Sequence, residues 1–159
     1  MRTTSAVLVS AALLAAGFVP TASAADETPP VSIQLTPGKG MWENSYSGWW
    51  EARSISSFTA RFTDTGSDNL RGLTVFISVP GEYELYSYSG DRWDCWDTEG
   101  GYDCHIDDLV VPGEAWPELT VTGYVRDHMN QPDSIDVYAT TGAYGWAHAG
   151  FPFKTNTST

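Results

Sequence analysis

The sequence predicts an all-β domain, either a sandwich or a barrel. Short runs in which apolar and polar residues alternate recur along the chain, and Gly, Pro, Asn or Asp residues separate them. Beyond the first residues, apolar side chains do not recur at helical spacing over any convincing window. Strands at intervals of about 8–12 residues, with turns between them, are typical of antiparallel sandwiches and barrels.

The expected strands follow from their alternating apolar residues. The clearest is 73–79, in which Leu, Val, Ile and Val occupy every second position. The segment 41–53 has no clear period, and we expect it to be a loop with some strand. Outside the cysteine-containing stretch, the full set of expected strands is 31–35, 55–62, 73–79, 83–88, 119–125, 135–139 and 151–153.

The chain begins with the features of a secretory signal peptide. A short positive start precedes a continuous run of small apolar residues over 6–19, and an Ala-x-Ala sequence follows it. The run is too short to span a bilayer, and no second apolar segment occurs. We expect residues 1–24 to be a cleaved signal peptide, 25–30 a disordered leader, 31–154 a single domain and 155–159 a flexible tail. The protein is expected to be secreted, or loosely associated with the cell surface.

The two cysteines predict a disulfide-pinned hairpin. In an exported chain, one pair of cysteines this close in sequence is expected to form a disulfide. If Cys95 faces Cys104 in an antiparallel pair, Glu99 and Gly100 form a two-residue loop. The cysteines are then a non-hydrogen-bonded pair, with a separation that a disulfide can span. A four-residue loop over 98–101 would keep the same register.

This register divides the hairpin residues between two faces, because successive side chains of a strand point to opposite sides. The face that carries the disulfide also carries Trp93 and Ile106, which we expect to lie in the core. The opposite face is expected to point outward, and it carries Asp94, Trp96, Asp103 and His105.

Several motifs follow one another in a distinctive order. They are Asp-Thr-Gly at 64–66, Leu-x-Val-x-Ile-x-Val-Pro at 73–80, Trp93 with Cys95 and Cys104, Leu-Val-Val-Pro-Gly-Glu at 109–114, and Leu-x-Val-x-Gly at 119–123. Over residues 54–141 this order resembles the Ig-like conserved repeat domain of bacterial secreted and cell-surface proteins, a family of unknown function. The resemblance implies an immunoglobulin-like antiparallel β-sandwich of about seven strands. It implies no catalytic residues, because the family has none to carry over.

The charge of the chain limits its partners. Twenty Asp and Glu residues stand against eight Lys and Arg residues, which gives a formal net charge of −12. So acidic a chain is not expected to bind nucleic acid or an anionic membrane through charge. We expect a monomer whose partner is a protein or a glycan.

No catalytic, cofactor-binding or metal-binding residue is predicted. The chain has no Gly-x-Ser-x-Gly or His-Glu-x-x-His motif. We expect His128 and His148 to be solvated side chains and not catalytic ones. The acids near the hairpin have the oxygen ligands that Ca²⁺ prefers, but no loop with the required ligand spacing is present. We expect them to form a solvated face.

Aromatic residues are the most specific binding candidates. Tyr46, Trp49 and Trp50 occur among Gly, Ser and Asn residues, where exposed rings could stack on sugars or anchor a protein partner. Tyr86 and Tyr88 are expected to project from one face of their strand and to extend this surface. The alternative is that Trp49 or Trp50 plugs one end of the sandwich, because a small β-domain with seven tryptophans must bury several of them.

The sequence thus predicts a secreted, non-catalytic interaction or surface-associated module. One alternative is a carbohydrate- or cell-wall-binding module that uses the aromatic segment, and another is a small secreted inhibitor or effector. A row of coplanar exposed rings would favour glycan binding, whereas a protruding apolar patch would favour a protein partner. Buried Trp49 and Trp50 without a cleft would favour a structural module.

Overall fold

The computed structural model describes residues 28–142 and 144–156. The expected signal peptide, the first half of the expected leader (25–27) and the last three residues lie outside this part of the chain. The described residues at both ends of the chain are held by hydrogen bonds to the rest of the domain. The Pro30 carbonyl accepts a hydrogen bond from the Thr65 amide at 2.8 Å. At the other end, Thr155 is fully buried, and its hydroxyl donates to the Asp127 carbonyl at 2.6 Å.

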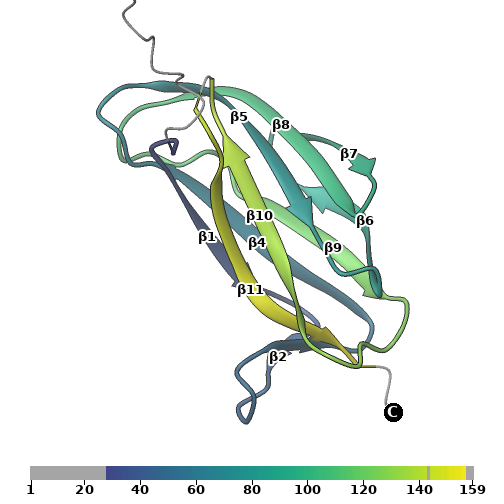
Figure 1. Ribbon diagram of the computed structural model, residues 1–159. Helices are drawn as coiled ribbons and strands as arrows, with labels where there is room; N and C mark the ends of the chain where they lie inside the picture. The colour runs from purple at the N-terminus through teal and green to yellow at the C-terminus, as the bar shows by residue number, and fades with distance from the viewer. Residues whose placement is uncertain (1–27, 143, 157–159) are drawn as a thin grey trace, which may run out of the picture.

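Two sheets pack face to face (Figure 1). The smaller sheet has four strands, in the order β1 (Val31–Pro37), β4 (Ile55–Asp64), β9 (Leu119–Val125) and β6 (Tyr83–Ser89). The larger sheet has seven, in the order β2 (Met41–Glu43), β3 (Trp50–Ala52), β11 (Ala147–Thr155), β10 (Asp133–Thr140), β5 (Leu70–Ser78), β8 (Gly101–Val110) and β7 (Asp94–Thr98). All pairs are antiparallel except β3 with β11.

The prediction of an antiparallel β-sandwich is confirmed, and the described residues contain no helix. The chain crosses repeatedly from one sheet to the other, as it does in immunoglobulin-like sandwiches. Residues 28–142 and 144–156 form eleven strands where about seven were expected. Part of the difference is that β2, β3 and β7 are short strands of three to five residues near the edges of the larger sheet.

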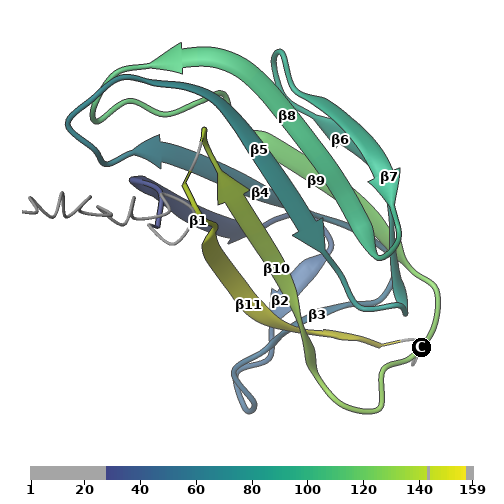
Figure 2. The ribbon, with the colours of Figure 1, turned by 45° about the horizontal axis from the view of Figure 1, so that its top comes forward.

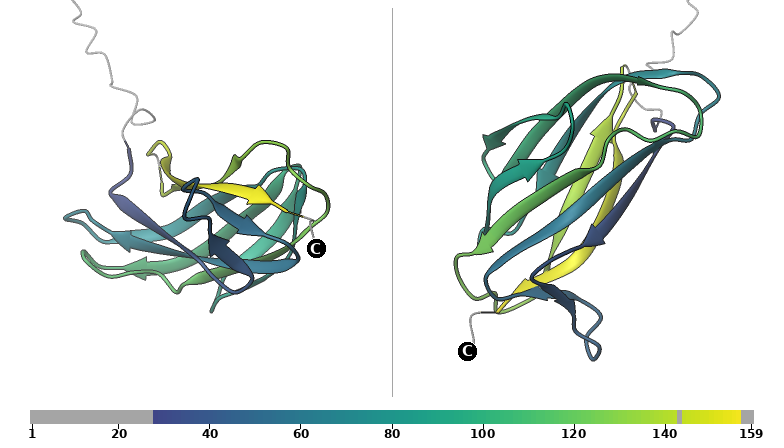
Figure 3. Two further views of the ribbon diagram at one scale, coloured as in Figure 1. Left: turned by 90° about the horizontal axis from the view of Figure 1, so that it is seen from below. Right: turned by 180° about the vertical axis from the view of Figure 1, so that it is seen from behind.

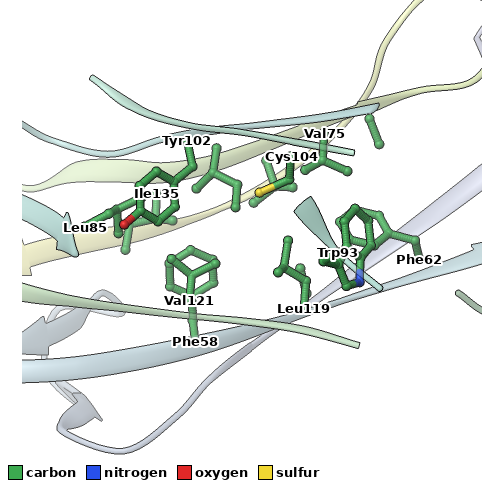
Figure 4. Close-up of a cluster of buried hydrophobic side chains, with 14 of the residues drawn as sticks. Phe58, Phe62, Val75, Leu85, Trp93, Tyr102, Cys104, Leu119, Val121 and Ile135 are labelled. Atoms are coloured by element: carbon green, nitrogen blue, oxygen red, sulfur yellow. The ribbon is translucent and has the colours of Figure 1, made fainter. Parts of the chain in front are cut away.

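The core lies between the sheets and follows the alternation of the sequence (Figure 4). Phe58 and Phe62 of β4 and Leu73 of β5 are fully buried, as their period predicts. Trp93 is also in the core, as expected, and its indole N–H donates to the Pro117 carbonyl at 2.8 Å. Burial of a tryptophan next to such an acceptor avoids leaving its N–H unsatisfied.

Tyr83 of β6 places a polar group inside this core. Its side chain is almost fully buried, and its hydroxyl lies 2.8 Å from Ser56 Oγ and donates to the Ser56 carbonyl at 2.9 Å. Burial raises the pKa of Tyr83 to about 12. The phenol is therefore a satisfied neutral group at physiological pH.

The predicted hairpin register is confirmed. Cys95 pairs with Cys104, their Cα atoms lie 4.0 Å apart, and the two sulfurs form a disulfide. The loop has two residues, Glu99 and Gly100, and of these only Gly100 has a positive φ, of 86°. A turn with one left-handed residue suits Glu99, which would be strained in a turn that needs two.

Candidate functional site

The first predicted aromatic group lies on the β2–β3 hairpin, which projects from one end of the sandwich (Figure 3). Tyr46 at its tip is 101% exposed, whereas Trp49 and Trp50 are half-buried. Trp50 packs against the core, while Trp49 lies under the Lys154 ammonium, with Nζ 5.9 Å from the ring centroid. One ring face of Trp49 is therefore occupied by a cation of the same chain.

A buried carboxylate anchors this hairpin. Glu51 is 7% exposed and accepts hydrogen bonds from Asn44 Nδ2 at 2.6 Å, Trp49 Nε1 at 3.1 Å and Asn156 Nδ2 at 3.3 Å. Burial alone would raise the pKa of Glu51, but these donors outweigh it and hold the pKa below its ordinary value. The Trp49 indole N–H is thus used in fixing the loop.

Tyr86 and Tyr88 do not share a face, so that expectation was wrong. The pairing of β6 with β9 shifts between Leu85 and Ser87, which makes Tyr86 an extra residue in a β-bulge. Tyr86 contacts the ring of Tyr124 on the outer side of the smaller sheet, with centroids 6.1 Å apart. Tyr88 instead contacts the buried ring of Tyr102, with centroids 6.2 Å apart. The bulge cancels the two-residue period on which the prediction depended.

The five predicted residues therefore do not form one site. The β2–β3 hairpin is at the edge of the larger sheet opposite β7 (Figure 1). Tyr86 and Tyr88 instead lie beside residues of β7. The structure gathers a different group of aromatic side chains. They lie on the outer face of the larger sheet, whose strands β11, β10, β5, β8 and β7 are side by side (Figure 2).

One row of directly paired residues crosses these five strands, and we call it the cross-strand row. Its members, in order, are His148, Tyr138, Phe76, Asp103 and Trp96. The outward position predicted for Trp96 is confirmed, since it is 51% exposed. Trp146, immediately before β11, is also 51% exposed and lies over the same face.

The rings of this row stack on one another. Tyr138 and His148 have centroids 4.7 Å apart and an interplanar angle of 27°, and Phe76 and Tyr138 have centroids 6.2 Å apart and an angle of 28°. Two nearly parallel rings with centroids only 4.7 Å apart must be stacked face to face, because two rings side by side in one plane would collide at that distance. Since Tyr138 and His148 are direct cross-strand partners, their faces point along the sheet and their edges point outward. Tyr138 and His148 therefore do not form the coplanar row that is expected of a sugar-stacking surface.

A cleft of about 460 Å³ opens beside the row, lined by Phe76, Ser78, Asp103, Tyr138 and Trp146. Asp103 is half-buried there, and among the described residues its carboxylate has no hydrogen bond or ion pair. An unpaired carboxylate beside aromatic rings is unusual, because burial favours pairing of a charge. The cleft therefore combines apolar walls with one available negative charge.

Sequence reasoning missed Phe76, Tyr138 and Trp146, although a signal was present for the first two. Phe76 lies between the inward residues Val75 and Ile77, and Tyr138 lies between Val137 and Ala139. A large aromatic residue at an outward position of a strand indicates an exposed ring.

Two clusters on this face contain the residue types of a hydrolase but not its arrangement. Asp136 accepts from Ser134 Oγ and lies 2.7 Å from His148 Nε2, so the carboxylate separates the serine from the histidine. In a catalytic triad the histidine must contact the hydroxyl. His148 is also not a simple solvated side chain, because its ring stacks on Tyr138 and contacts the Asp136 carboxylate.

The second cluster has the right order but lacks other requirements. Thr74 Oγ1 lies 3.3 Å from His105 Nδ1, and His105 Nε2 lies 3.1 Å from Asp107. Asp107 is almost fully exposed, and Thr74 is on β5, which pairs with strands on both sides. The backbone amides around it are therefore used in the sheet rather than free to stabilise an oxyanion.

Residues 28–142 and 144–156 contain no group of three or more His, Cys, Asp or Glu side chains placed to hold a metal ion. They also contain no helix long and apolar enough to cross a membrane.

The chain has only distant similarity to known proteins. No family model matches the chain, and no curated protein sequence matches it. Among solved structures, it is similar to a non-cellulosomal cohesin from the archaeon Archaeoglobus fulgidus, with 10% identity and a TM-score of 0.47 over 78% of this chain and 91% of that one. It is similar to the seventh ScaB type I cohesin from Pseudobacteroides cellulosolvens, with 10% identity and a TM-score of 0.47 over 80% and 94%. It also matches AvmM, which catalyses macrocyclization in alchivemycin A biosynthesis, with 11% identity and a TM-score of 0.37 over 82% and 92%. These likenesses are too remote to assign a function.

Proposed function

We propose that this chain is a secreted, non-catalytic interaction module that binds a partner protein through the outer face of its larger sheet. The observation that carries the proposal is the cleft beside the cross-strand row, where exposed Trp146 and half-buried Tyr138 and Phe76 surround an unpaired carboxylate. Aromatic side chains held on a rigid surface are the usual anchors of protein interfaces. The sheet beneath them is rigid, because its inner face is a packed core.

Protein binding accounts for this surface better than glycan binding does. The ring faces of Tyr138 and His148 cover each other, so a sugar ring has little access to them. The exposed edges and the Tyr138 hydroxyl suit side-chain packing and hydrogen bonds. Carbohydrate binding by Tyr46, Trp49 and Trp50 has less support, because Trp49 carries Lys154 on its ring and Trp50 packs on the core.

The extracellular location is supported by the disulfide, since such bonds persist in oxidising compartments. Membership of the Ig-like conserved repeat family remains part of the proposal, and the order of its motifs along consecutive strands is its support. A small secreted inhibitor or effector would use the same kind of surface and is included in this proposal.

The test is capture with two matched double variants. Tyr138→Ser with Trp146→Ser removes two aromatics from the proposed face, and Tyr46→Ser with Tyr86→Ser removes two from other surfaces. Immobilised residues 25–159 would be exposed separately to culture-supernatant proteins, peptidoglycan and soluble polysaccharides. We expect one or more supernatant proteins to be retained by the wild type and the second variant and lost by the first.

Two results would contradict the proposal. One is retention of peptidoglycan or polysaccharide, but of no protein, by the wild type. The other is equal protein capture by both double variants, provided that each shows a cooperative unfolding transition. In that case the outer face of the larger sheet is not the binding surface.

A further inference from the structure

We propose that the cleft accepts an arginine side chain of the partner, with its guanidinium held between the aromatic walls and the Asp103 carboxylate. This inference rests on the proposed function and specifies the chemistry of the bound segment. It starts from an electrostatic imbalance. Asp103 is half-buried beside Phe76 and Tyr138, yet no side chain among the described residues pairs with it.

Two other half-buried acids of the same sheet have partners. Asp136 is bonded to Ser134 and His148, and Asp108 accepts two contacts of 2.8 Å from Arg92. Asp103 lies on the same sheet but has no such partner. The binding of an external cation would compensate the partial burial of its charge.

The chain has few cations of its own with which to fill the cleft. It has only eight Lys and Arg residues, and most of the described ones are engaged elsewhere. Lys154 lies over Trp49 and Arg53 over Trp42, while the pairs Arg61–Glu118, Arg92–Asp108 and Arg126–Glu84 are salt bridges. A second copy is an unsuitable occupant, because each copy has a formal net charge of −12 and two copies repel each other.

The shape and lining of the cleft match a guanidinium better than an ammonium. Its walls are the rings of Phe76, Tyr138 and Trp146, and Ser78 provides a hydroxyl beside Asp103. A guanidinium is planar, stacks on aromatic rings and can donate two parallel hydrogen bonds to a carboxylate. A volume of about 460 Å³ leaves room for the side chain and part of the flanking backbone.

The probes are peptides selected from a random twelve-residue display library. The library is selected on the wild type and depleted on the Tyr138→Ser, Trp146→Ser variant, so that the remaining binders depend on the cleft. Each binder that contains arginine is then synthesised with arginine and with citrulline, which has the same shape without the charge. Dissociation constants are measured with the wild type, with Asp103→Asn, and with Asp94→Asn as the matched control on the same outward face of the hairpin.

We expect arginine to be enriched in the depleted pool. Replacing it by citrulline, or Asp103 by Asn, should weaken binding about tenfold, and the two changes together should weaken it little further, because both remove one contact. Asp94→Asn should weaken binding less than threefold, as expected of an exposed charge that does not line the cleft.

Other outcomes separate this inference from the proposed function. Cleft-dependent binders without arginine, or equal effects of Asp103→Asn and Asp94→Asn, would refute the arginine site and leave a protein-binding face. Failure to recover any binder that depends on Tyr138 and Trp146 would refute both. Each variant is first shown to fold by its cooperative unfolding transition.

Discussion

Reduction of the Cys95–Cys104 disulfide should destabilise the domain by an amount set by the loop that it closes. The two cysteines are nine residues apart in sequence. In the chain-entropy description, cross-linking a loop of this length lowers the stability of the unfolded state by about 2.7 kcal/mol at 25 °C. Reduction keeps both sulfur atoms, which need only move apart to van der Waals distance, and a buried thiol behaves as a small apolar group, so the packing around Cys104 should change little. The expected loss is therefore close to the entropic value.

Urea unfolding followed by tryptophan fluorescence, with and without dithiothreitol, measures this difference. The control is Cys95→Ala with Cys104→Ala, for which the reductant should have no effect, although removal of a fully buried sulfur should itself cost about 1 kcal/mol. The loop-closure argument would be refuted if reduction lowered the wild type's free energy of unfolding by less than about 1 kcal/mol while the slope of that free energy against urea concentration stayed the same. It would mean that pairing of β7 with β8 holds the hairpin without the bond.

Two further predictions concern pH. The pKa of Tyr83 is raised by burial from 10.0 to about 12, so between these values the folded protein keeps a proton that the unfolded chain loses. The free energy of unfolding should fall by up to about 2–3 kcal/mol as the pH rises through this window, and Tyr83→Phe should reduce the slope of stability against pH. The opposite sign applies to Glu51, whose hydrogen bonds hold its folded-state pKa below the ordinary value of 4.5. The stability that Glu51 contributes is complete above pH 4.5 and is lost as the pH falls through its folded-state pKa. Glu51→Gln should therefore lower the free energy of unfolding by about 1–2 kcal/mol at pH 7 and make it depend less on pH in the acid range. An unchanged dependence on pH in the acid range would contradict the assignment.

Much of the fold is encoded locally and could be predicted. The two-residue period of β4 and β5 identifies their buried side chains, since one face of each meets the core. The hairpin register could be predicted because two cysteines and a glycine lie within a few residues of each other. Outward positions were also correct for Asp94 and Trp96, because they follow from the same register.

The candidate site could not be predicted, because it depends on which strands become neighbours. Alternation places Phe76 and Tyr138 on outer faces, but only the pairing of β5 with β10 brings them together. That pairing joins distant parts of the sequence and has no local signal. The bulge at Tyr86 was missed for a different reason: one extra residue reverses every later side chain of β6, and no glycine or proline marks it.

The edges of both sheets also favour binding through a face. A partner that adds a strand needs a long, regular edge with free backbone groups. In the larger sheet the edge strand β2 has three residues, and β7 has five and carries the exposed charges of Asp94 and Asp97. In the smaller sheet β1 ends in Pro37, and the bulge at Tyr86 interrupts β6. Strand addition is therefore disfavoured at these edges, which agrees with the proposal that side chains on the outer face of the larger sheet contact the partner. Affinity should then depend on individual aromatic and charged residues there, which is why single substitutions such as Asp103→Asn can test the proposal.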